Sequence, residues 1–518
     1  MYQKTKNKFS RFQDKPFRQY QEEAIRFIHE STKPICVIQA PTGSGKSLIG
    51  MCAGTLFDDF TYLVSSKQLQ SQLHQDFPEV EMMKGRNNYA CLLRIGKTCD
   101  DCLHSKITPC PYKPMCPYEV QKKRVLNAKW RLLNYYYFLT ESNYVGGFSG
   151  SSILICDEGD LLEGLLANFV SLRIPGGLLT KLDIGPPRFK TAEAEHGVES
   201  WIDWAQNEAG AKVYRRLSDV QEDMESIGDP DHPDLEGLKR EENNLKTIYN
   251  RLEIFVKHVD ENWIFEEKSK SYSFRPTWMP EELSEQYFFR HTERVVLMSA
   301  TFPPPAILGK LLGRPPGDFD YLEIPSVFPI KNRQVYLKPV GNITYKLFDT
   351  EAPKIIDEIN RLLAKHLHEK GMIHAVSYKL AQLIMDNIGI DRLIIHNRTN
   401  REEVLERFKK SDRPLVLVSP SMERGVDLPD KLCGFIIYAK APFLSLGDKL
   451  TSKRVFGSGI GALWYRSLCA QTIVQGCGRG VRHENDKCTT YLLDEQMYRL
   501  IVDSRFLFPE DFIDAVEL

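Results

Sequence analysis

The chain has 518 residues, of which 42% are hydrophobic, and its formal net charge is -1 with an isoelectric point near 6.9. This length suggests about three or four domains, and the near-neutral charge excludes binding to nucleic acid through an overall basic character. No run approaches the roughly 18–20 apolar residues of a membrane span, and Met1–Lys15 is polar and Lys-rich, unlike a secretory signal. We therefore expect a cytoplasmic, nucleoid or nuclear protein without membrane attachment.

Short apolar runs alternate with longer amphipathic segments along most of the chain. They predict buried strands at Ile35–Gln39, Tyr62–Ser65, Ile153–Cys156 and Val295–Met298 in the first part, and at Met372–Val376, Leu393–His396, Leu415–Val418, Phe435–Tyr438 and Thr490–Leu493 in the second. Continuous apolar strands separated by helices are typical of parallel sheets covered on both faces. The sequence thus predicts an α/β fold with two parallel-sheet domains.

Two segments interrupt this pattern, and we interpret both as insertions into the first α/β domain. Gly85–Lys129 contains five cysteines and several prolines, which a regular α/β unit does not accommodate. Glu163–Arg290 has apolar residues at helical spacing between Leu235 and Val259, which predict a long amphipathic helix. Ile324–Arg333, with two prolines, is the predicted linker to the second domain.

A phosphate-binding loop is predicted directly after the first strand. The segment Ala40-Pro41-Thr42-Gly43-Ser44-Gly45-Lys46-Ser47 fits the P-loop pattern except at Ala40, where the pattern has glycine. Backbone N–H groups of such a loop and the following helix N-terminus hold phosphates. Lys46 is expected to neutralise the β- and γ-phosphates of ATP, and Ser47 to contribute a hydroxyl to Mg²⁺.

A pair of carboxylates completes this candidate ATP site. Asp157 and Glu158 follow the strand Ile153–Cys156, so they lie at the edge where parallel sheets bind ligands. We expect Asp157 to belong to the Mg²⁺ shell and Glu158 to act as the general base on the attacking water.

With these residues placed, nearly the whole chain resembles the XPD/DinG-like group of superfamily 2 helicases. Arg18-Gln19-Tyr20-Gln21 resembles the adenine-reading motif, and a Gln21 amide can pair with adenine. Ser65-Ser66 resembles the segment that contacts the nucleic-acid backbone, although a plain helix cap is an equal alternative. Ser299-Ala300-Thr301 resembles the family's coupling motif. Two later motifs also match, Ser419 to Asp427, which includes Gly425, and Gln475 to Arg482. The resemblance implies that Ser65, Ser66, Ser299, Thr301 and Gly425 couple nucleic acid to the ATP site.

The resemblance also implies catalytic roles for the last of these motifs. Gln475, Arg479 and Arg482 are expected on one helix of the second domain, with the two arginines on a shared face reaching the γ-phosphate as arginine fingers. Asp427 is expected to touch the nucleotide. One position departs from the family pattern: Asp160 stands where the Asp-Glu-Ala-His motif has its histidine. We expect hydrolysis to be retained. The histidine's role of connecting the nucleotide state to the coupling motif does not carry over to this chain.

The cysteine-rich insertion resembles the iron–sulfur domain of DinG-like helicases, with Cys91 at its entry and Cys116 at its exit. A [4Fe–4S] cluster takes four thiolates, and we expect Cys91, Cys102, Cys110 and Cys116 to supply them, with Cys99 as a possible substitute for Cys102. Zn²⁺ is the alternative, because zinc sites also use Cys-x₂-Cys pairs such as Cys99 and Cys102.

The expected organisation is RecA-like motor domain 1 at residues 1–84, 130–162 and 291–323, an iron–sulfur domain at 85–129, a mainly helical arch domain at 163–290, and RecA-like motor domain 2 at 324–518. Aromatic residues of the arch are expected to pack in its core, with stacking on bases as the alternative; they are Trp201, Trp204, Trp263 and Tyr272.

The family implies a monomeric ATP-dependent DNA helicase that translocates 5′→3′ on single-stranded DNA and opens tailed or forked duplexes in repair, replication or recombination. Two alternatives remain open from the sequence. One is a DNA-stimulated ATPase that remodels protein–DNA complexes without unwinding, and the other is a helicase acting on RNA or RNA–DNA hybrids. Protein partners are not indicated.

Overall fold

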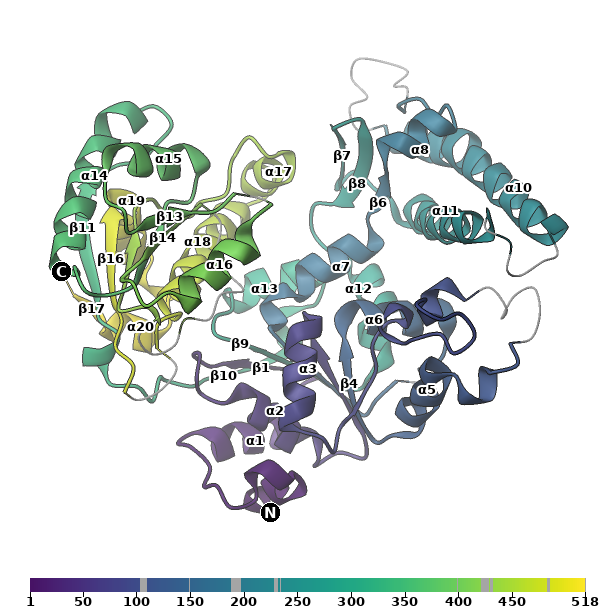
Figure 1. Ribbon diagram of the computed structural model, residues 1–518, viewed down its shortest axis with the longest axis horizontal. Helices are drawn as coiled ribbons and strands as arrows, with labels where there is room; N and C mark the ends of the chain where they lie inside the picture. The colour runs from purple at the N-terminus through teal and green to yellow at the C-terminus, as the bar shows by residue number, and fades with distance from the viewer. Residues whose placement is uncertain are drawn as a thin grey trace.

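The computed structural model describes residues 1–102, 110–148, 150–187, 197–227, 232, 234–397, 399–420, 428, 432–481 and 485–517. Two parallel sheets organise it, each covered by helices, which confirms the predicted fold class. Figure 1 shows the second sheet with its helices as a separate lobe, in green to yellow, beside the first. Within the described ranges, no helix is both long and apolar enough to cross a membrane.

The first sheet has seven parallel strands in the order β10-β1-β9-β5-β2-β4-β3. They are β1 (Ile35–Gln39), β2 (Phe60–Val64), β3 (Glu81–Met82), β4 (Trp130–Asn134), β5 (Ile153–Asp157), β9 (Val295–Ser299) and β10 (Phe319–Glu323). The four predicted strands are the central β1, β9, β5 and β2. The others were not predicted because they lie toward the edges and carry polar residues such as Arg131 and Asp320, which interrupt the apolar run.

Helices of this first domain are α1 (Gln21–Glu30), α2 (Lys46–Gly54), α3 (Lys67–Asp76), α6 (Tyr135–Thr140), α7 (Leu162–Val170) and α13 (Pro305–Leu312). The sheet's inner strands are buried between them, except for the partly exposed Gln39 at the end of β1. Because β1, β9, β5 and β2 are neighbours and parallel, the loops after all four strands open at the same edge of the sheet. That edge carries the candidate ATP site.

The second sheet is also parallel, in the order β13-β14-β12-β15-β16-β11-β17. Its strands are β11 (Val335–Gly341), β12 (Gly371–His374), β13 (Leu393–Ile395), β14 (Val416–Ser419), β15 (Phe435–Tyr438), β16 (Thr489–Asp494) and β17 (Val516–Glu517). Its helices are α14 (Phe348–Lys365), α15 (Tyr378–Asn387), α16 (Arg401–Lys410), α17 (Lys449–Gly457), α18 (Gly461–Cys477), α19 (Glu495–Asp503) and α20 (Glu510–Asp514). All five strands predicted for this part are present; β11 and β17, at one edge, were not predicted.

The insertion that follows α7 contains helices α8 (Gly176–Lys181), α9 (Val198–Asp203), α10 (Ala211–Ile227), α11 (Asp234–His258) and α12 (Glu281–Tyr287). The helix α11 matches the predicted amphipathic stretch. The insertion also contains an antiparallel sheet, β6 (Leu172–Ile174), β8 (Ser271–Pro276) and β7 (Trp263–Lys268), which was not predicted. Trp201, Trp204, Trp263 and Tyr272 are buried, so the core-packing interpretation is correct.

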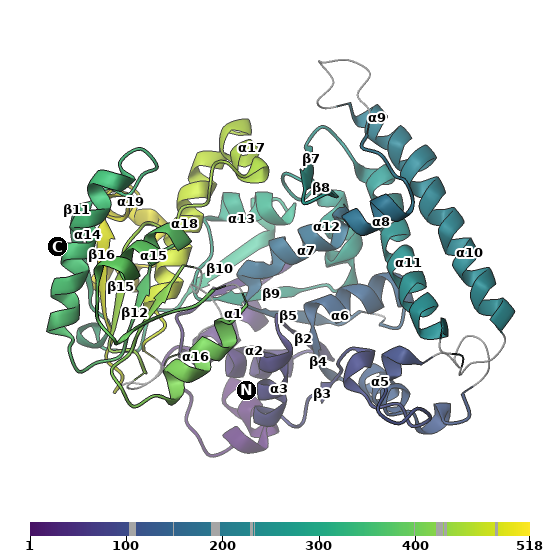
Figure 2. The same ribbon diagram turned by 45° about the horizontal axis from the view of Figure 1, so that its top comes forward.

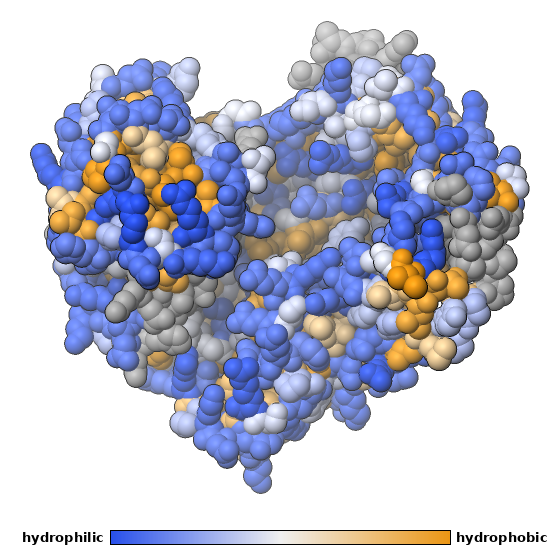
Figure 3. Space-filling model, in the orientation of Figure 1, coloured by the Kyte–Doolittle hydropathy of each residue, from blue (hydrophilic) through white to orange (hydrophobic). Residues whose placement is uncertain are grey.

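The cysteine-rich insertion contains little regular secondary structure and ends in helix α5 (Pro117–Asn127). It contacts the larger insertion through two ion pairs with exposed cations and partly buried carboxylates: Lys97 with Glu236 at 2.8 Å and Arg240 with Asp101 at 3.9 Å. Figure 3 shows that the surface is hollowed between the second-sheet lobe and the larger insertion. The hollow lies beside the edge where the two sheets face each other.

Candidate nucleotide site and cysteine cavity

The loop Ala40–Gly45 joins the carboxyl end of β1 to the N-terminus of α2. Gly43 and Gly45 have φ angles of 84° and 81°, in the left-handed region that other residues rarely adopt. The Lys46 ammonium donates hydrogen bonds to the carbonyls of the first two loop residues, at 2.9 and 3.2 Å. This strand–turn–helix geometry can bind phosphate through backbone N–H groups and the helix N-terminus.

Gln21 lies buried beneath this loop and holds it from below. Its amide nitrogen donates to the Ser44 carbonyl at 2.9 Å, and its amide oxygen accepts from the Arg18 backbone N–H at 2.9 Å. The Arg18 guanidinium donates to the Gly43 carbonyl at 2.5 Å. A Cβ at Gly45 would collide with the Gln21 amide. In this arrangement Gln21 positions the loop, and adenine reading by Gln21 stays a prediction.

Asp157 ends β5 and is buried within a network that includes two tyrosines. Its Oδ2 accepts a hydrogen bond from the Tyr62 hydroxyl at 2.9 Å, and the Tyr135 hydroxyl donates to its carbonyl oxygen at 2.8 Å. The Ser47 side chain lies near the Tyr62 hydroxyl; burial raises the pKa of that hydroxyl, and Ser47 lowers it. Sequence reasoning missed both tyrosines, because an aromatic residue in or after an apolar strand is normally counted as core.

The Asp157 carboxyl and the Ser47 hydroxyl therefore meet through Tyr62 at the base of the loop. Burial raises the pKa of Asp157, while the nearby Lys46 charge lowers it. A buried carboxylate beside a serine hydroxyl provides the oxygen ligands that Mg²⁺ prefers. These residues fit a magnesium–nucleotide complex.

Glu158 follows Asp157 in a left-handed backbone conformation, with φ of 51°. Its Oε2 accepts a hydrogen bond from the Ser65 hydroxyl. Burial raises the pKa of Glu158; the Ser65 hydrogen bond and the charge of Arg479, from the second domain, lower it. A carboxylate with a raised pKa is a stronger base, which is what activation of a water molecule needs.

Asp160 bridges the two domains. Its Oδ1 accepts from the Ser299 hydroxyl at 2.6 Å, and its Oδ2 accepts from the Gln475 amide nitrogen at 3.0 Å. The same nitrogen of Gln475 lies 3.2 Å from the Thr301 hydroxyl. The residue that departs from the family pattern thus joins the segment after β9 to helix α18.

The other predicted coupling residues have separate positions. Ser66 caps α3, and its hydroxyl accepts from the Leu69 backbone N–H at 3.2 Å, as in the helix-cap alternative. Thr42 faces Gly478 across the cleft, since a Cβ at Gly478 would lie 3.4 Å from the Thr42 hydroxyl. Gly425, Asp427 and Arg482 lie outside the described residues.

The prediction that Gln475 and Arg479 share a helix is wrong. Helix α18 ends at Cys477, and Arg479 lies in the turn that follows. Glycines at 478 and 480 flank Arg479, and glycine favours helix termination over continuation. Arg479 nevertheless faces the first domain closely enough for its charge to act on Glu158.

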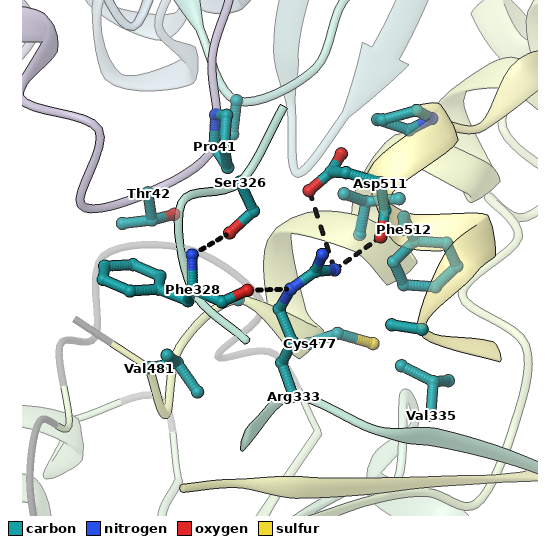
Figure 4. Close-up of a pocket in the computed structure, with 15 residues that line it drawn as sticks. Pro41, Thr42, Ser326, Phe328, Arg333, Val335, Cys477, Val481, Asp511 and Phe512 are labelled. Atoms are coloured by element: carbon teal, nitrogen blue, oxygen red, sulfur yellow. Dashed lines mark hydrogen bonds and ion pairs between the residues drawn. The ribbon is translucent and has the colours of Figure 1, made fainter. Parts of the chain in front are cut away.

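A small, mainly apolar cavity of about 70 Å³ lies between the phosphate loop and the second domain. Figure 4 shows Pro41 and Thr42 on one side and Phe328 of the interdomain segment within it. The Arg333 guanidinium donates to the Phe328 carbonyl at 3.2 Å and lies 3.7 Å from the Asp511 carboxylate. These contacts fix the interdomain segment against the second domain, next to the loop.

All five cysteines of the first insertion line one cavity. They are Cys91, Cys99, Cys102, Cys110 and Cys116. Cys99, the predicted spare, is buried, and its sulfur lies 3.6 Å from that of Cys116. No group of three or more His, Cys, Asp or Glu side chains is close enough to hold a single metal ion in the part of the chain that the structure describes.

Comparison with protein families matches two parts of the chain. Residues 355–507 match the family described as helicase C-terminal domain, and residues 14–104 match the family described as type III restriction enzyme, res subunit. The first match covers most of the second sheet with its helices, and the second covers the phosphate loop.

Among curated proteins, the chain is similar to the ATP-dependent DNA helicase CHL1 of Saccharomyces cerevisiae (strain YJM789), with 23% identity over 273 residues. The match covers 44% of this chain and 31% of that protein, so the chain spans less than a third of the relative's length.

Among solved structures, the fold is similar to an XPD helicase, with a TM-score of 0.63 at 16% identity over 95% of this chain and 98% of that one. It is also similar to S. tokodaii Xpd4, with a TM-score of 0.57 at 14% identity over 97% of this chain and 100% of that one. At these identities the similarity establishes the shared fold.

Proposed function

We propose that the chain is a member of the XPD/DinG-like group of superfamily 2 helicases and an ATP-dependent DNA helicase that moves 5′→3′ on single-stranded DNA. The observation that carries the proposal is the bridge from Asp160 to Gln475, because it connects the hydrolytic carboxylates to the other motor domain. Hydrolysis without such a connection does no mechanical work.

The proposed hydrolytic step uses residues of both motor domains. The phosphate loop and Lys46 would hold the β- and γ-phosphates, and Ser47 and Asp157 would hold a Mg²⁺ ion whose charge would offset that of the phosphates. Glu158, kept basic by burial, takes the proton of the attacking water. Arg479 approaches from the second domain and stabilises the charge on the transferring phosphoryl group.

The proposed coupling follows from what Asp160 contacts. In the structure Gln475 already contacts Asp160 and Thr301, so opening of the cleft would break these contacts and draw Arg479 away from Glu158, and closing would restore them. Release of phosphate removes the charge that attracts Arg479, so the second domain can withdraw. Each turnover then gives one closing and one opening of the cleft, and strand movement is tied to that cycle.

The test of this function is unwinding of matched duplexes that differ only in the polarity of a single-stranded tail. We expect ATP-dependent opening of the 5′-tailed duplex and little opening of the 3′-tailed one. Fluorescent strand release with DNA, RNA and hybrid versions of both substrates measures direction and strand type together.

Three outcomes would contradict the proposal in different ways. Opening of only the 3′-tailed duplex would reverse the polarity. ATP turnover that DNA stimulates without any strand release would favour the remodelling ATPase. Preference for RNA or hybrid strands would change the substrate while keeping the motor.

We also propose that four thiolates of the first insertion hold a [4Fe–4S] cluster, which would cross-link this segment covalently. The five convergent cysteines support the proposal. At 3.6 Å the sulfurs of Cys99 and Cys116 are too close to bind different irons of one cluster, so in this arrangement only one of them would be a ligand. The resemblance of Cys116-Pro117-Tyr118 to the exit of the family's iron–sulfur domain favours Cys116, and we assign Cys91, Cys102, Cys110 and Cys116.

Anaerobically purified protein is expected to be brown, with broad absorption near about 400 nm from thiolate-bound iron. Cys91→Ser, Cys110→Ser and Cys116→Ser should each lose this absorption and unwinding, because ligation supplies much of the folding energy of such a segment. Basal ATP hydrolysis should fall less, since the phosphate loop and Asp157 lie outside the insertion.

Cys99→Ser is the matched control and should keep the colour. Loss of colour in Cys99→Ser but not in Cys102→Ser would exchange these two assignments. Colourless protein with one equivalent of zinc by elemental analysis would replace the cluster with a zinc site, for which the separation of Cys99 and Cys116 is also suitable.

A further inference from the structure

A second contact between the motor domains lies away from the nucleotide and centres on Arg454 of α17. Its guanidinium lies 4.9 and 5.0 Å from the ring centroids of Trp278 and Trp464, two indoles that meet edge to face with their centroids 5.9 Å apart. It donates to the Glu163 carboxylate at 2.6 Å and to the Thr277 carbonyl at 2.5 Å. The Arg454 side chain is only 5% exposed. Stacking and charge pairing away from water make this the most enclosed polar contact between α17 and the rest of the molecule.

The partners of Arg454 come from different parts of the chain. Glu163 belongs to α7, which begins directly after the Asp160 turn. Trp278 lies near the end of the larger insertion. Ile307 of α13, in the first motor domain, completes a small apolar core with Trp278 and Trp464. One junction therefore joins the second motor domain both to the first and to the insertion.

The same helix is fastened to the small sheet of the insertion. Lys449 donates to the Phe265 carbonyl at 3.0 Å, and Lys453 donates to the carbonyls of Glu261 at 2.8 Å and Trp263 at 3.1 Å. Figure 2 shows α17 at the side of the second lobe that faces β7. These contacts are more exposed than the Arg454 junction, so water can replace them when the domains move.

Helix α18 connects the Arg454 junction to the nucleotide site. Trp464 is near its first residue and Gln475 near its last. A helix rises about 1.5 Å per residue, so the two ends are roughly 16 Å apart along a stiff rod. In this structure the Gln475 end already contacts Asp160, so with the Trp464 end held in place an opening of the cleft would swing the Gln475 end away along an arc, and closing would return it.

We propose that Arg454 is a positioning residue that forms the pivot on which the second motor domain turns when the cleft closes. The inference rests on the proposed ATP-driven motor and adds where its hinge lies. The junction stays intact through the cycle because separating Arg454 from Glu163 would leave a buried guanidinium without its charge partner. The exposed hydrogen bonds of Lys449 and Lys453 are instead replaced by hydrogen bonds to water when the domains move.

The test measures domain geometry directly. Fluorophores on genetically encoded side chains at Lys33 and Val502, both exposed, report the distance between the motor domains. In the unsubstituted protein we expect a narrow distance distribution that shifts with Mg²⁺ and a non-hydrolysable ATP analogue. Arg454→Met should broaden the distribution without nucleotide and weaken the shift, and Arg454→Lys should restore part of both.

Arg499→Met is the matched control, because Arg499 forms an exposed ion pair with Glu495 in the same motor domain. It should behave like the unsubstituted protein. Glu163→Gln keeps both indoles and removes only the charge partner, so it still reports on the junction if Arg454→Met does not fold. A distribution in Arg454→Met and Glu163→Gln equal to that of the control would overturn the pivot.

Activity gives a second readout. Basal ATP turnover of Arg454→Lys should be unchanged, while DNA stimulation should fall on the order of tenfold, the scale of a typical coupling between sites. Equal losses of basal and stimulated turnover would point to general destabilisation and contradict a pivot. The nucleotide-free distance distribution needs neither ATP turnover nor unwinding, so the pivot and the proposed function can fail separately.

Discussion

Lys46→Ala is expected to abolish measurable ATP hydrolysis, with a loss of at least about 10²-fold, the scale for removing one group that stabilises transition-state charge. The substitution removes the ammonium that lies at the turn between β1 and α2. It also removes two hydrogen bonds to loop carbonyls, so nucleotide affinity should fall as well. Phosphate release with and without single-stranded DNA measures the effect.

Glu158→Gln separates binding from chemistry at the same site. The amide keeps the size of the side chain but cannot take a proton, so ATP should still bind without turnover. Lys310→Ala, an exposed lysine of the same domain, is the control for Lys46→Ala. Normal turnover in either Lys46→Ala or Glu158→Gln would refute the site.

Arg479→Ala is expected to reduce turnover by about 10³-fold or more, the range seen when an arginine finger is removed. The side chain comes from the second domain and acts on Glu158 across the cleft, so nucleotide affinity of the first domain should change little. Steady-state kinetics and equilibrium binding of an ATP analogue distinguish the two effects.

The control for Arg479 is Arg499→Ala, which removes an exposed guanidinium from α19. It should leave turnover unchanged. A decrease of less than about fivefold in Arg479→Ala, well below the range for an arginine finger, would mean that Arg479 is an ordinary surface residue. A large rise in the nucleotide dissociation constant would instead make it a binding residue.

The fold was predictable where burial alone determines the pattern of apolar residues along a strand. Strands such as β5 and β9 are covered on both faces and read as uninterrupted apolar runs. Strand β10 lies at the edge of the sheet and contains Asp320, whereas β4 lies between β2 and β3 and contains Arg131, which is buried in an ion pair with Asp59 at 3.0 Å. Both charges interrupt the apolar run, so both strands were missed. The β7–β8 hairpin has charged residues on its open face and resembles a loop in sequence.

The candidate site was predictable only where its residues are contiguous. The phosphate loop and the Asp157-Glu158 pair lie in short motifs whose spacing follows from one strand and one turn. Contacts made by Tyr62 depend on strand order, and those of Arg454 depend on how two domains pack. Neither is encoded in local spacing, so both required the three-dimensional structure.

The bridge at Asp160 also fixes the direction of hydrogen bonding at this point of the cleft. A carboxylate only accepts hydrogen bonds, and its two oxygens accept from Ser299 and Gln475. A neutral imidazole at position 160 offers one acceptor and one donor, so it would accept from one of these partners and donate to the other. A serine hydroxyl or the carbonyl oxygen of a turned glutamine amide can accept that N–H, so histidine at this position would reverse one of the two hydrogen bonds and leave residues 299 and 475 unchanged.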